Sequence, residues 1–145
     1  MMNPTNDPFP TMRMSVPNLP ELLARLRSDS IKHGVTIVHA KAQGEGDWIL
    51  GTASARLKRG NLKIVGPEPH TPKDLVEHAL RIGAKIVLAG ELRREEDSRA
   101  LRAAAALGVH AVGVITAGKL SEAQALLAFL GPWTNYDVSL LSDTV

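Results

Sequence analysis

Polar side chains suited to catalysis follow two apolar segments of the chain. Glu91 and Arg93 come at the end of the apolar run 86–90, and Thr116 and Lys119 come at the end of the next one. In a parallel sheet, residues just past the carboxyl end of a strand face the crevice where such sheets bind ligands. A carboxylate there can orient water beside magnesium-bound phosphate, while cations stabilise charge on phosphoryl oxygens. The pattern predicts Glu91 and Arg93 as catalytic residues and Thr116 and Lys119 as ligand-binding residues.

The same charged pair also has a purely structural interpretation. Helix starts favour acidic side chains because the amino end of the helix dipole is positive. Glu91 would then cap the helix that begins near Arg94. Arg93 would pair with Glu96 or Asp97. Position in the sequence does not by itself separate the two interpretations.

Capping residues and glycines predict where the surrounding helices and strands lie. Thr71 predicts a helix start and Gly83 the end of that helix. The acidic residues 95–97 predict the start of the next helix, and Ser121 predicts another through a capping box with Gln124. Strands are expected at 34–40, 61–66, 84–90 and 109–116, and helices are expected to begin near residues 18, 71, 94 and 121.

The order of these elements predicts the fold class. Strands that alternate with helices over short connections favour parallel strands joined by right-handed crossovers. We therefore expect an α/β fold, a mostly parallel sheet with helices on both faces, in a single three-layer domain. Residues 41–47 are typical of a turn, and 48–57 fit either a strand or a strand-to-helix junction. The expected organisation is a flexible N-terminal arm at 1–17, the α/β domain at 18–131 and a C-terminal tail at 132–145.

The composition argues against several classes of function. The 145 residues include no cysteine, which excludes disulfides, thiolate chemistry and cysteine-ligated zinc. Aromatic residues make up only 3%, which argues against a protein that stacks bases on aromatic side chains. No stretch has the length and apolarity of a membrane span, and the N-terminus lacks the pattern of a secretory leader. We therefore expect no membrane insertion and a cytoplasmic location.

Histidine spacing does not predict a metal centre. The five histidines include no close pair at helical or zinc-finger spacing. His39 and His110 both fall in expected strands and could share a metal if they met near an end of the sheet. The alternative is that the histidines are scattered surface or hydrogen-bonded residues.

A longer pattern surrounds the charged pair. It consists of A-L-R at 79–81, an apolar strand at 86–89, G-E-x-R-x-x-E at 90–96 and A-A-x-x-G at 104–108, all in one register. This stretch resembles the Walker B region of the ATPases that power type II secretion, twitching pili, type IV secretion and conjugation. The resemblance covers about thirty residues and extends more weakly to about residue 130.

The resemblance implies roles for two residues, but the chain lacks one motif of the family. Glu91 would correspond to the acidic residue near magnesium and the attacking water, and Arg93 would belong to the same nucleotide-facing turn, so ATP and magnesium are the ligands it implies. The family carries G-x-x-G-x-G-K-[ST] before this region, whereas this chain contains no G-K-[ST]. Residues 46–60, which include Gly51 and Ser54, are at best a remnant of such a loop.

Without the loop there is neither a backbone cradle nor a lysine for the β- and γ-phosphates. We therefore do not expect autonomous ATP hydrolysis. The sequence favours a non-catalytic or degenerate relative of a secretion, pilus or conjugation motor. Such a chain would act through contacts with a protein partner or within a homo-oligomer.

Another resemblance leaves an enzymatic alternative open. The segment A-G-K-L-S-E at 117–122 is similar to the G-H-x-x-S-E element of a dinuclear-metal family related to type 2 GTP cyclohydrolases. Lys119 stands where that family has a ligand histidine, and a cation there would repel a metal. In this alternative the chain is a small α/β ligand-binding domain or enzyme with a phosphate- or metal-dependent site.

A basic run provides the last alternative. Residues 56–63 contain four cations and no carboxylate, which is a pattern that binds phosphate or nucleic-acid backbone without regard to sequence. The chain would then be an accessory nucleic-acid-binding module, unless the run is simply a solvated face. The cations are Arg56, Lys58, Arg59 and Lys63.

Overall fold

The computed structural model describes residues 18–27, 34–58, 63–67, 71–134 and 136–142, in which five helices alternate with five strands. The expected arm at 1–17 and Arg59 lie outside the described residues. The helices are α1 (Asn18–Leu26), α2 (Glu45–Lys58), α3 (Pro72–Ile82), α4 (Glu95–Ala106) and α5 (Leu120–Phe129). The strands are β1 (Gly34–Ala40), β2 (Ile64–Val65), β3 (Ile86–Glu91), β4 (His110–Thr116) and β5 (Asp137–Leu141).

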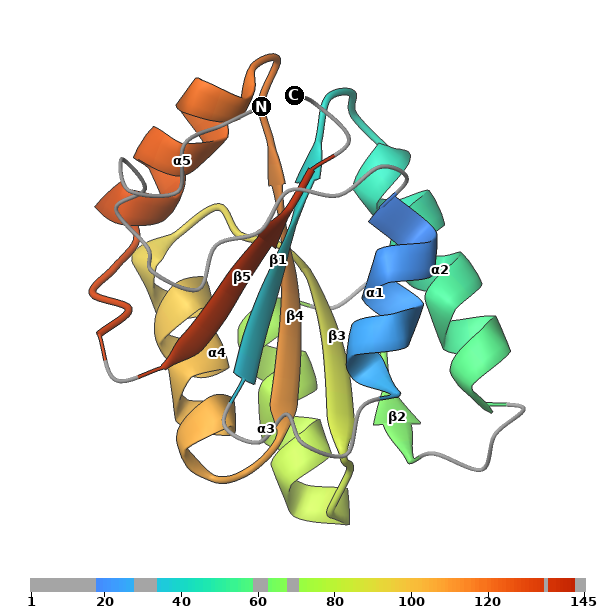
Figure 1. Ribbon diagram of the computed structural model, residues 1–145. Helices are drawn as coiled ribbons and strands as arrows, with labels where there is room; N and C mark the ends of the chain where they lie inside the picture. Colours follow the sequence, from blue (N-terminus) through green and yellow to red (C-terminus); the bar gives the residue numbers. More distant parts are fainter. Residues whose placement is uncertain (1–17, 28–33, 59–62, 68–70, 135, 143–145) are drawn as a thin grey trace.

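The strands form one parallel sheet in the order β2-β3-β4-β1-β5, with helices on both faces (Figure 1). Helices α1 and α2 cover one face, where Leu22 and Leu50 pack with Val112. Helices α3, α4 and α5 cover the other, where Leu101 packs with Val87. This confirms the predicted α/β fold in three layers.

Helix α3 begins and ends at the residues that the sequence indicated. Thr71 has an extended backbone, and its hydroxyl accepts a hydrogen bond from the Asp74 amide at 3.2 Å. Gly83 ends the helix with a φ of 70°, a left-handed conformation that only glycine adopts without cost. Both signals are local, which is why they could be read from neighbouring residues.

Helix α2 takes in the end of the turn expected at 41–47 and all of the ambiguous segment 48–57, so the turn is confined to 41–44. Its buried apolar side chains include Ile49, Leu50, Ala53 and Leu57, a spacing that places them on one side of a helix. These residues pack against the sheet together with α1. The run of Trp48, Ile49 and Leu50 looks strand-like in isolation, and tertiary packing overrides that local preference.

Two further expectations differ from the structure. Helix α5 begins at Leu120 with Lys119 in the capping position, so the capping box predicted at Ser121 is wrong. The segment 132–145, expected to be a tail, contains β5, which pairs in parallel with β1. Trp133 is buried just before this strand, and its indole nitrogen donates to the Leu127 carbonyl at 2.7 Å. The sheet therefore extends beyond residue 131.

Candidate functional site

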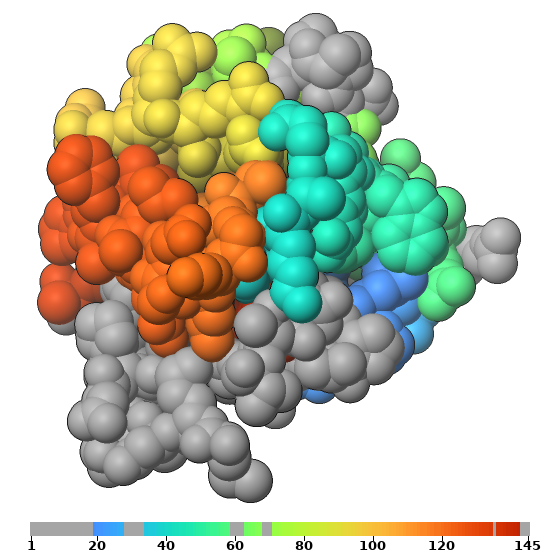
Figure 2. All heavy atoms as spheres, turned by 90° about the horizontal axis from the view of Figure 1, so that it is seen from above, coloured from blue at the N-terminus to red at the C-terminus, as the bar shows by residue number. Residues whose placement is uncertain are grey.

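The connections that follow β1, β3 and β4 meet at the carboxyl edge of the sheet. Helix α2 leaves β1 toward β2, whereas α5 leaves the neighbouring β4 toward β5 on the opposite side. The crossover direction thus reverses between β1 and β4, and open α/β sheets bind ligands at such switch points. Figure 2 looks down on this edge, where the β1–α2 connection (cyan), the β3–α4 connection (yellow) and the β4–α5 connection (orange) come together.

The Glu91 side chain makes two contacts at this edge. Its Oε1 accepts a hydrogen bond from the Thr116 hydroxyl at 2.5 Å. Its Oε2 accepts from Nε of Arg93 at 2.6 Å. The structure therefore brings together three of the residues that the sequence singled out, from two neighbouring strands.

A bulge in β3 positions the glutamate. Leu88 pairs with Val112, but Gly90 pairs with Gly113, so one extra residue is accommodated between them. Gly90 has a φ of 100°, which a residue with a side chain rarely adopts. The bulge shifts Glu91 relative to β4, where its side chain reaches Thr116.

These contacts determine the charge of the glutamate. Partial burial raises the pKa of Glu91, but hydrogen bonds from Thr116 and Arg93 and the positive charge of Arg93 lower it by more. The net pKa lies below the ordinary value for a glutamate. The same hydrogen bond raises the pKa of the Arg93 guanidinium. Glu91 is thus an ionised carboxylate at neutral pH with a partner on each oxygen, rather than a proton donor.

The pKa of Glu91 provides a first prediction. Replacing Arg93 with methionine removes a hydrogen bond and a positive charge from the carboxylate, so the pKa of Glu91 rises. Replacing Thr116 with valine, whose side chain has a similar size, removes the other hydrogen bond and also raises the pKa of Glu91. NMR titration of the Glu91 side-chain carboxyl carbon measures both shifts. Arg99→Met, on the exposed face of α4, is the control and leaves the Glu91 pKa unchanged. An unshifted pKa in both site variants contradicts the contacts described.

Two acidic residues beside Glu91 were not recognised as site residues from the sequence. Asp97 is buried, and its Oδ2 accepts from the backbone amides of Arg93 and Arg94 at 3.0 and 3.1 Å. The sequence indicates Asp97 only as a residue that favours a helix start or pairs with the Arg93 side chain. Asp47 lies in the first turn of α2 near Arg93, whose positive charge it stabilises. Asp47 was missed because residues 41–47 were read as a turn.

The site contains two hollows that share Asp47, Glu91 and Arg93. One has a volume of about 30 Å³ and lies against the β1–α2 connection, beside Gly46 and Thr116. The other has a volume of about 390 Å³ and lies between the starts of α2, α3 and α4, with Asp97 among its lining residues. The first is far below the size of a typical small-molecule site, whereas the second falls within that range.

The β1–α2 connection does not fit a bound triphosphate. A phosphate loop needs a long glycine-rich turn that ends in a lysine at the start of the helix, but this connection consists of residues 41–44, and its lysine, Lys41, directly follows β1. The helix that follows packs directly on β4, because a Cβ on Gly46 would overlap Val114. Its first turn carries Glu45 and Asp47, whose negative charges occupy the position where a helix attracts phosphate.

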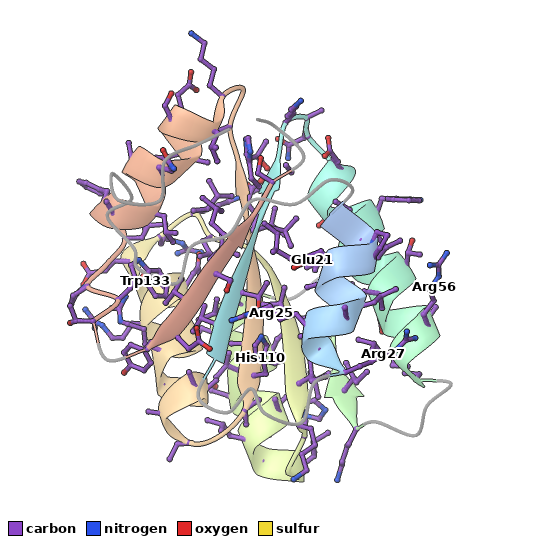
Figure 3. The ribbon with its side chains drawn as sticks, viewed as in Figure 1. Glu21, Arg25, Arg27, Arg56, His110 and Trp133 are labelled. Carbon is purple, nitrogen blue, oxygen red and sulfur yellow. The ribbon has the colours of Figure 1, made fainter. Side chains whose placement is uncertain are left out.

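The remaining predicted ligand-binding residues lie away from this site. Lys119 is exposed at the start of α5 and, among the described residues, belongs to neither hollow. Arg56 and Lys58 are in the last turns of α2, about 20 Å along the helix axis from its start, and Figure 3 shows Arg56 on the outer side of α2. Gly51 and Ser54 lie inside the same helix, so the described part of the expected remnant loop, residues 46–58, is helical.

His39 and His110 do not meet. His39 pairs with Ile115 near the carboxyl edge of the sheet, whereas His110 begins β4 at the opposite edge. His39 is buried, with its Nε2 2.8 Å from the Ala117 carbonyl and its Nδ1 2.8 Å from the Ser142 hydroxyl. The described residues include no group of three or more histidine, aspartate or glutamate side chains placed to hold a metal ion. The shared metal considered for His39 and His110 is therefore wrong.

Comparisons with known proteins do not assign the chain to a family. No protein-family model matches the sequence, and no curated protein has significant similarity to it. Within the described residues, no helix combines the length and apolarity needed to cross a membrane.

Proposed function

We propose that the chain is a non-catalytic relative of the secretion, pilus and conjugation motor ATPases, and that it acts in the cytoplasm through contacts with a partner protein. The observation that carries the proposal is the state of Glu91. This carboxylate stands where the resemblance implies a magnesium- and water-facing acid, but both of its oxygens are bound by Thr116 and Arg93. Glu91 is therefore bound to residues of its own chain at the position where a nucleotide motor would direct it toward magnesium and water.

The arrangement of strands supports the kinship. A phosphate loop joins a strand to a helix at the carboxyl edge of a parallel sheet. Here β1 and α2 make that connection, and only β4 separates β1 from the strand that carries Glu91. The connection has the place of a phosphate loop but not its length, its lysine at the start of the helix or its open space. These features favour descent from a motor core without its hydrolytic activity.

Exposed aromatic side chains support action through protein contacts. The chain has only five aromatic residues, yet Trp48 is 63% exposed and Phe129 is 86% exposed. Leu126, one turn before Phe129 on α5, is 44% exposed. Aromatic residues exposed in this way are the usual anchors of protein interfaces.

Calorimetric titration with ATP and magnesium tests the loss of nucleotide binding. We expect no measurable binding at millimolar ATP, and no difference between the native chain and Glu91→Gln, because the site lacks a phosphate cradle. Tight binding of ATP with magnesium that is lost on Glu91→Gln would refute the proposal.

Retention of a motor subunit tests the positive part of the proposal. The tagged native chain should retain a protein that carries an intact G-x-x-x-x-G-K-[ST] loop. Phe129→Ser or Trp48→Ser should reduce that retention, whereas Leu107→Ser, which changes an equally exposed aliphatic residue on another surface, should not. Recovery of the chain from its source without any such subunit counts against the motor kinship.

A small ligand-binding domain is a second candidate, favoured by the hollow of about 390 Å³. Arg93 and Arg94 line it and would pair with an anionic group, while the carboxylates of Asp47, Glu91 and Asp97 line it as well and favour a ligand that carries a cation. Pyrophosphate with magnesium is a suitable probe. Binding of pyrophosphate that is lost in Arg94→Ala, without any binding of ATP, would support this candidate in place of the motor relative.

A further inference from the structure

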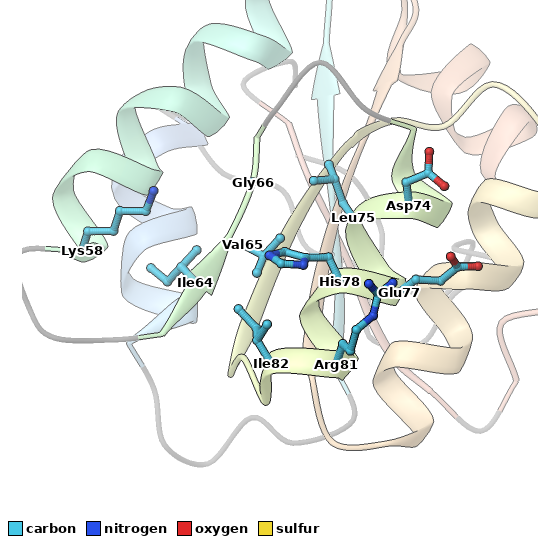
Figure 4. A pocket seen from close by; sticks show the side chains of 10 residues that line it. All are labelled: Lys58, Ile64, Val65, Gly66, Asp74, Leu75, Glu77, His78, Arg81 and Ile82. Carbon is cyan, nitrogen blue, oxygen red and sulfur yellow. The ribbon is translucent and has the colours of Figure 1, made fainter.

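A groove of about 610 Å³ follows the outer edge of β2 and shares no lining residue with the hollows at Glu91 (Figure 4). Ile64, Val65 and Gly66 line one side of it. Helix α3 contributes Ile82, which is exposed, and Leu75, which is almost fully buried, so the apolar surface of that wall comes mainly from Ile82. The groove therefore combines the edge of a strand with apolar side chains.

The backbone of β2 is hydrogen-bonded to β3 on one side and faces the groove on the other. The Lys63 carbonyl accepts a hydrogen bond from the Lys85 amide at 2.8 Å, so this carbonyl faces β3. Successive carbonyls of a strand point to opposite sides, and Ile64 therefore directs its N–H and C=O away from β3. Among the described strands β2 is the last on this side of the sheet. Backbone groups on such an edge are a template for pairing with another chain.

The charged residues of the groove are distributed unevenly. Lys58 stands on the α2 wall, and Lys63 is exposed where β2 begins. Arg81 lies on the α3 wall, and the carboxylates Asp74 and Glu77 belong to that wall as well. The α2 wall and the start of the strand are therefore cationic, while the α3 wall is apolar with charges of both signs.

We propose that the edge of β2 binds an extended segment of a partner protein as a sixth strand, in which acidic and apolar side chains alternate. Side chains of an added strand point alternately to the two faces of the sheet. One set would pack on Ile82 of α3, and the other would meet Lys58 of α2. Lys63 and Pro67 flank the edge, so the segment that pairs is short. This inference does not depend on kinship with motor ATPases.

Fluorescence anisotropy with two synthetic peptides tests the proposal. The probe is a fluorescein-labelled hexapeptide in which valine and glutamate alternate, and its counterpart has lysine in place of glutamate. We expect the Val–Glu peptide to bind about tenfold more tightly than the Val–Lys peptide. Methylation of alternate backbone nitrogens on the Val–Glu peptide should abolish binding, because strand addition requires those N–H groups. Equal affinity for the two peptides overturns the proposal.

Charge reversal on the protein tests whether the peptide binds in the groove. Lys58→Glu combined with Lys63→Glu should weaken Val–Glu binding by about tenfold or more. Lys73→Glu is the matched control, because Lys73 is exposed on α3 outside the groove, and it should leave binding unchanged. Circular dichroism confirms that all variants fold. If the double variant binds as the native chain does, or if single-stranded DNA displaces the peptide at lower concentration, the peptide assignment is wrong.

Discussion

Replacing Gly66 with alanine should lower the free energy of unfolding by about 3 kcal/mol or more. Gly66 has a φ of 87°, a left-handed conformation that costs a residue with a side chain about 1–2 kcal/mol. A Cβ at this position would also overlap the backbone carbonyl of Leu88 in β3. A backbone atom cannot move aside as the end of a flexible side chain can, so the overlap separates β2 from β3.

Thermal and urea unfolding followed by circular dichroism measure this effect. For a chain of this length, we expect the midpoint temperature of Gly66→Ala to fall by roughly 10 °C. Gly51→Ala is the control with the opposite sign. Gly51 is exposed within α2, and a Cβ there meets nothing within 4 Å among the described residues. Alanine should stabilise that helix by about 0.5–1 kcal/mol. A Gly66→Ala midpoint equal to that of the native chain would contradict the close approach of β2 to β3.

Acid should destabilise the fold through His110. This residue is buried at the start of β4, where α1 places Arg25 against the sheet (Figure 3). Nε of Arg25 donates to the Thr36 hydroxyl oxygen at 2.9 Å, and that oxygen lies 2.7 Å from Nε2 of His110. The Thr36 hydroxyl and Nε2 of His110 thus share a buried hydrogen bond, whose direction is set by the tautomer of the ring. Burial, followed by the charge of Arg25, lowers the pKa of His110 to about 4.

The direction of the pH effect follows from linkage. In the unfolded chain a histidine titrates near pH 6.5. His110 in the folded chain takes up its proton only near pH 4, so between these two values the unfolded state binds one more proton than the folded state. Stability due to His110 is fully present above pH 6.5 and declines as the pH falls toward 4. The total loss is about 3 kcal/mol, at about 1.4 kcal/mol for each pKa unit.

Urea unfolding at a series of pH values between 7 and 4 tests this prediction. His110→Asn should be less stable at neutral pH but should lose about 3 kcal/mol less than the native chain over this range. His78→Asn, an exposed histidine on α3, is the control and should keep the native pH dependence. Direct NMR titration of the His110 ring does not depend on the variant. A ring pKa near 6.5 in the folded chain would show the prediction to be wrong.

Much of the fold could be predicted because its signals are local. The cap at Thr71 and the left-handed glycine at Gly83 identify α3 from adjacent residues. Apolar runs bounded by glycines identify β1, β3 and β4, and short connections between strands and helices predict a parallel sheet. The placement of Glu91 near Thr116 followed from the same rule, since parallel strands end at one edge.

The elements that differ from the prediction made from the sequence depend on contacts between distant residues. Helix α2 forms because Ile49, Leu50 and Leu57 are buried against α1 and the sheet, although the same residues look strand-like in isolation. Strand β5 forms because β1 offers it a pairing edge, a partner about a hundred residues earlier in the chain. Neither partner is visible in the local sequence.

Local patterns along the chain are sufficient to predict the class of fold and to place Glu91, Arg93 and Thr116 at one sheet edge. Long-range packing adds Asp47 and Asp97 to them, binds Glu91 on both oxygens, and puts Arg56 and Lys58 elsewhere. The difference arises because caps, turns and hydrophobic periodicity act over a few residues. Distances between side chains depend on strand order and helix packing, which arise from contacts across the whole chain.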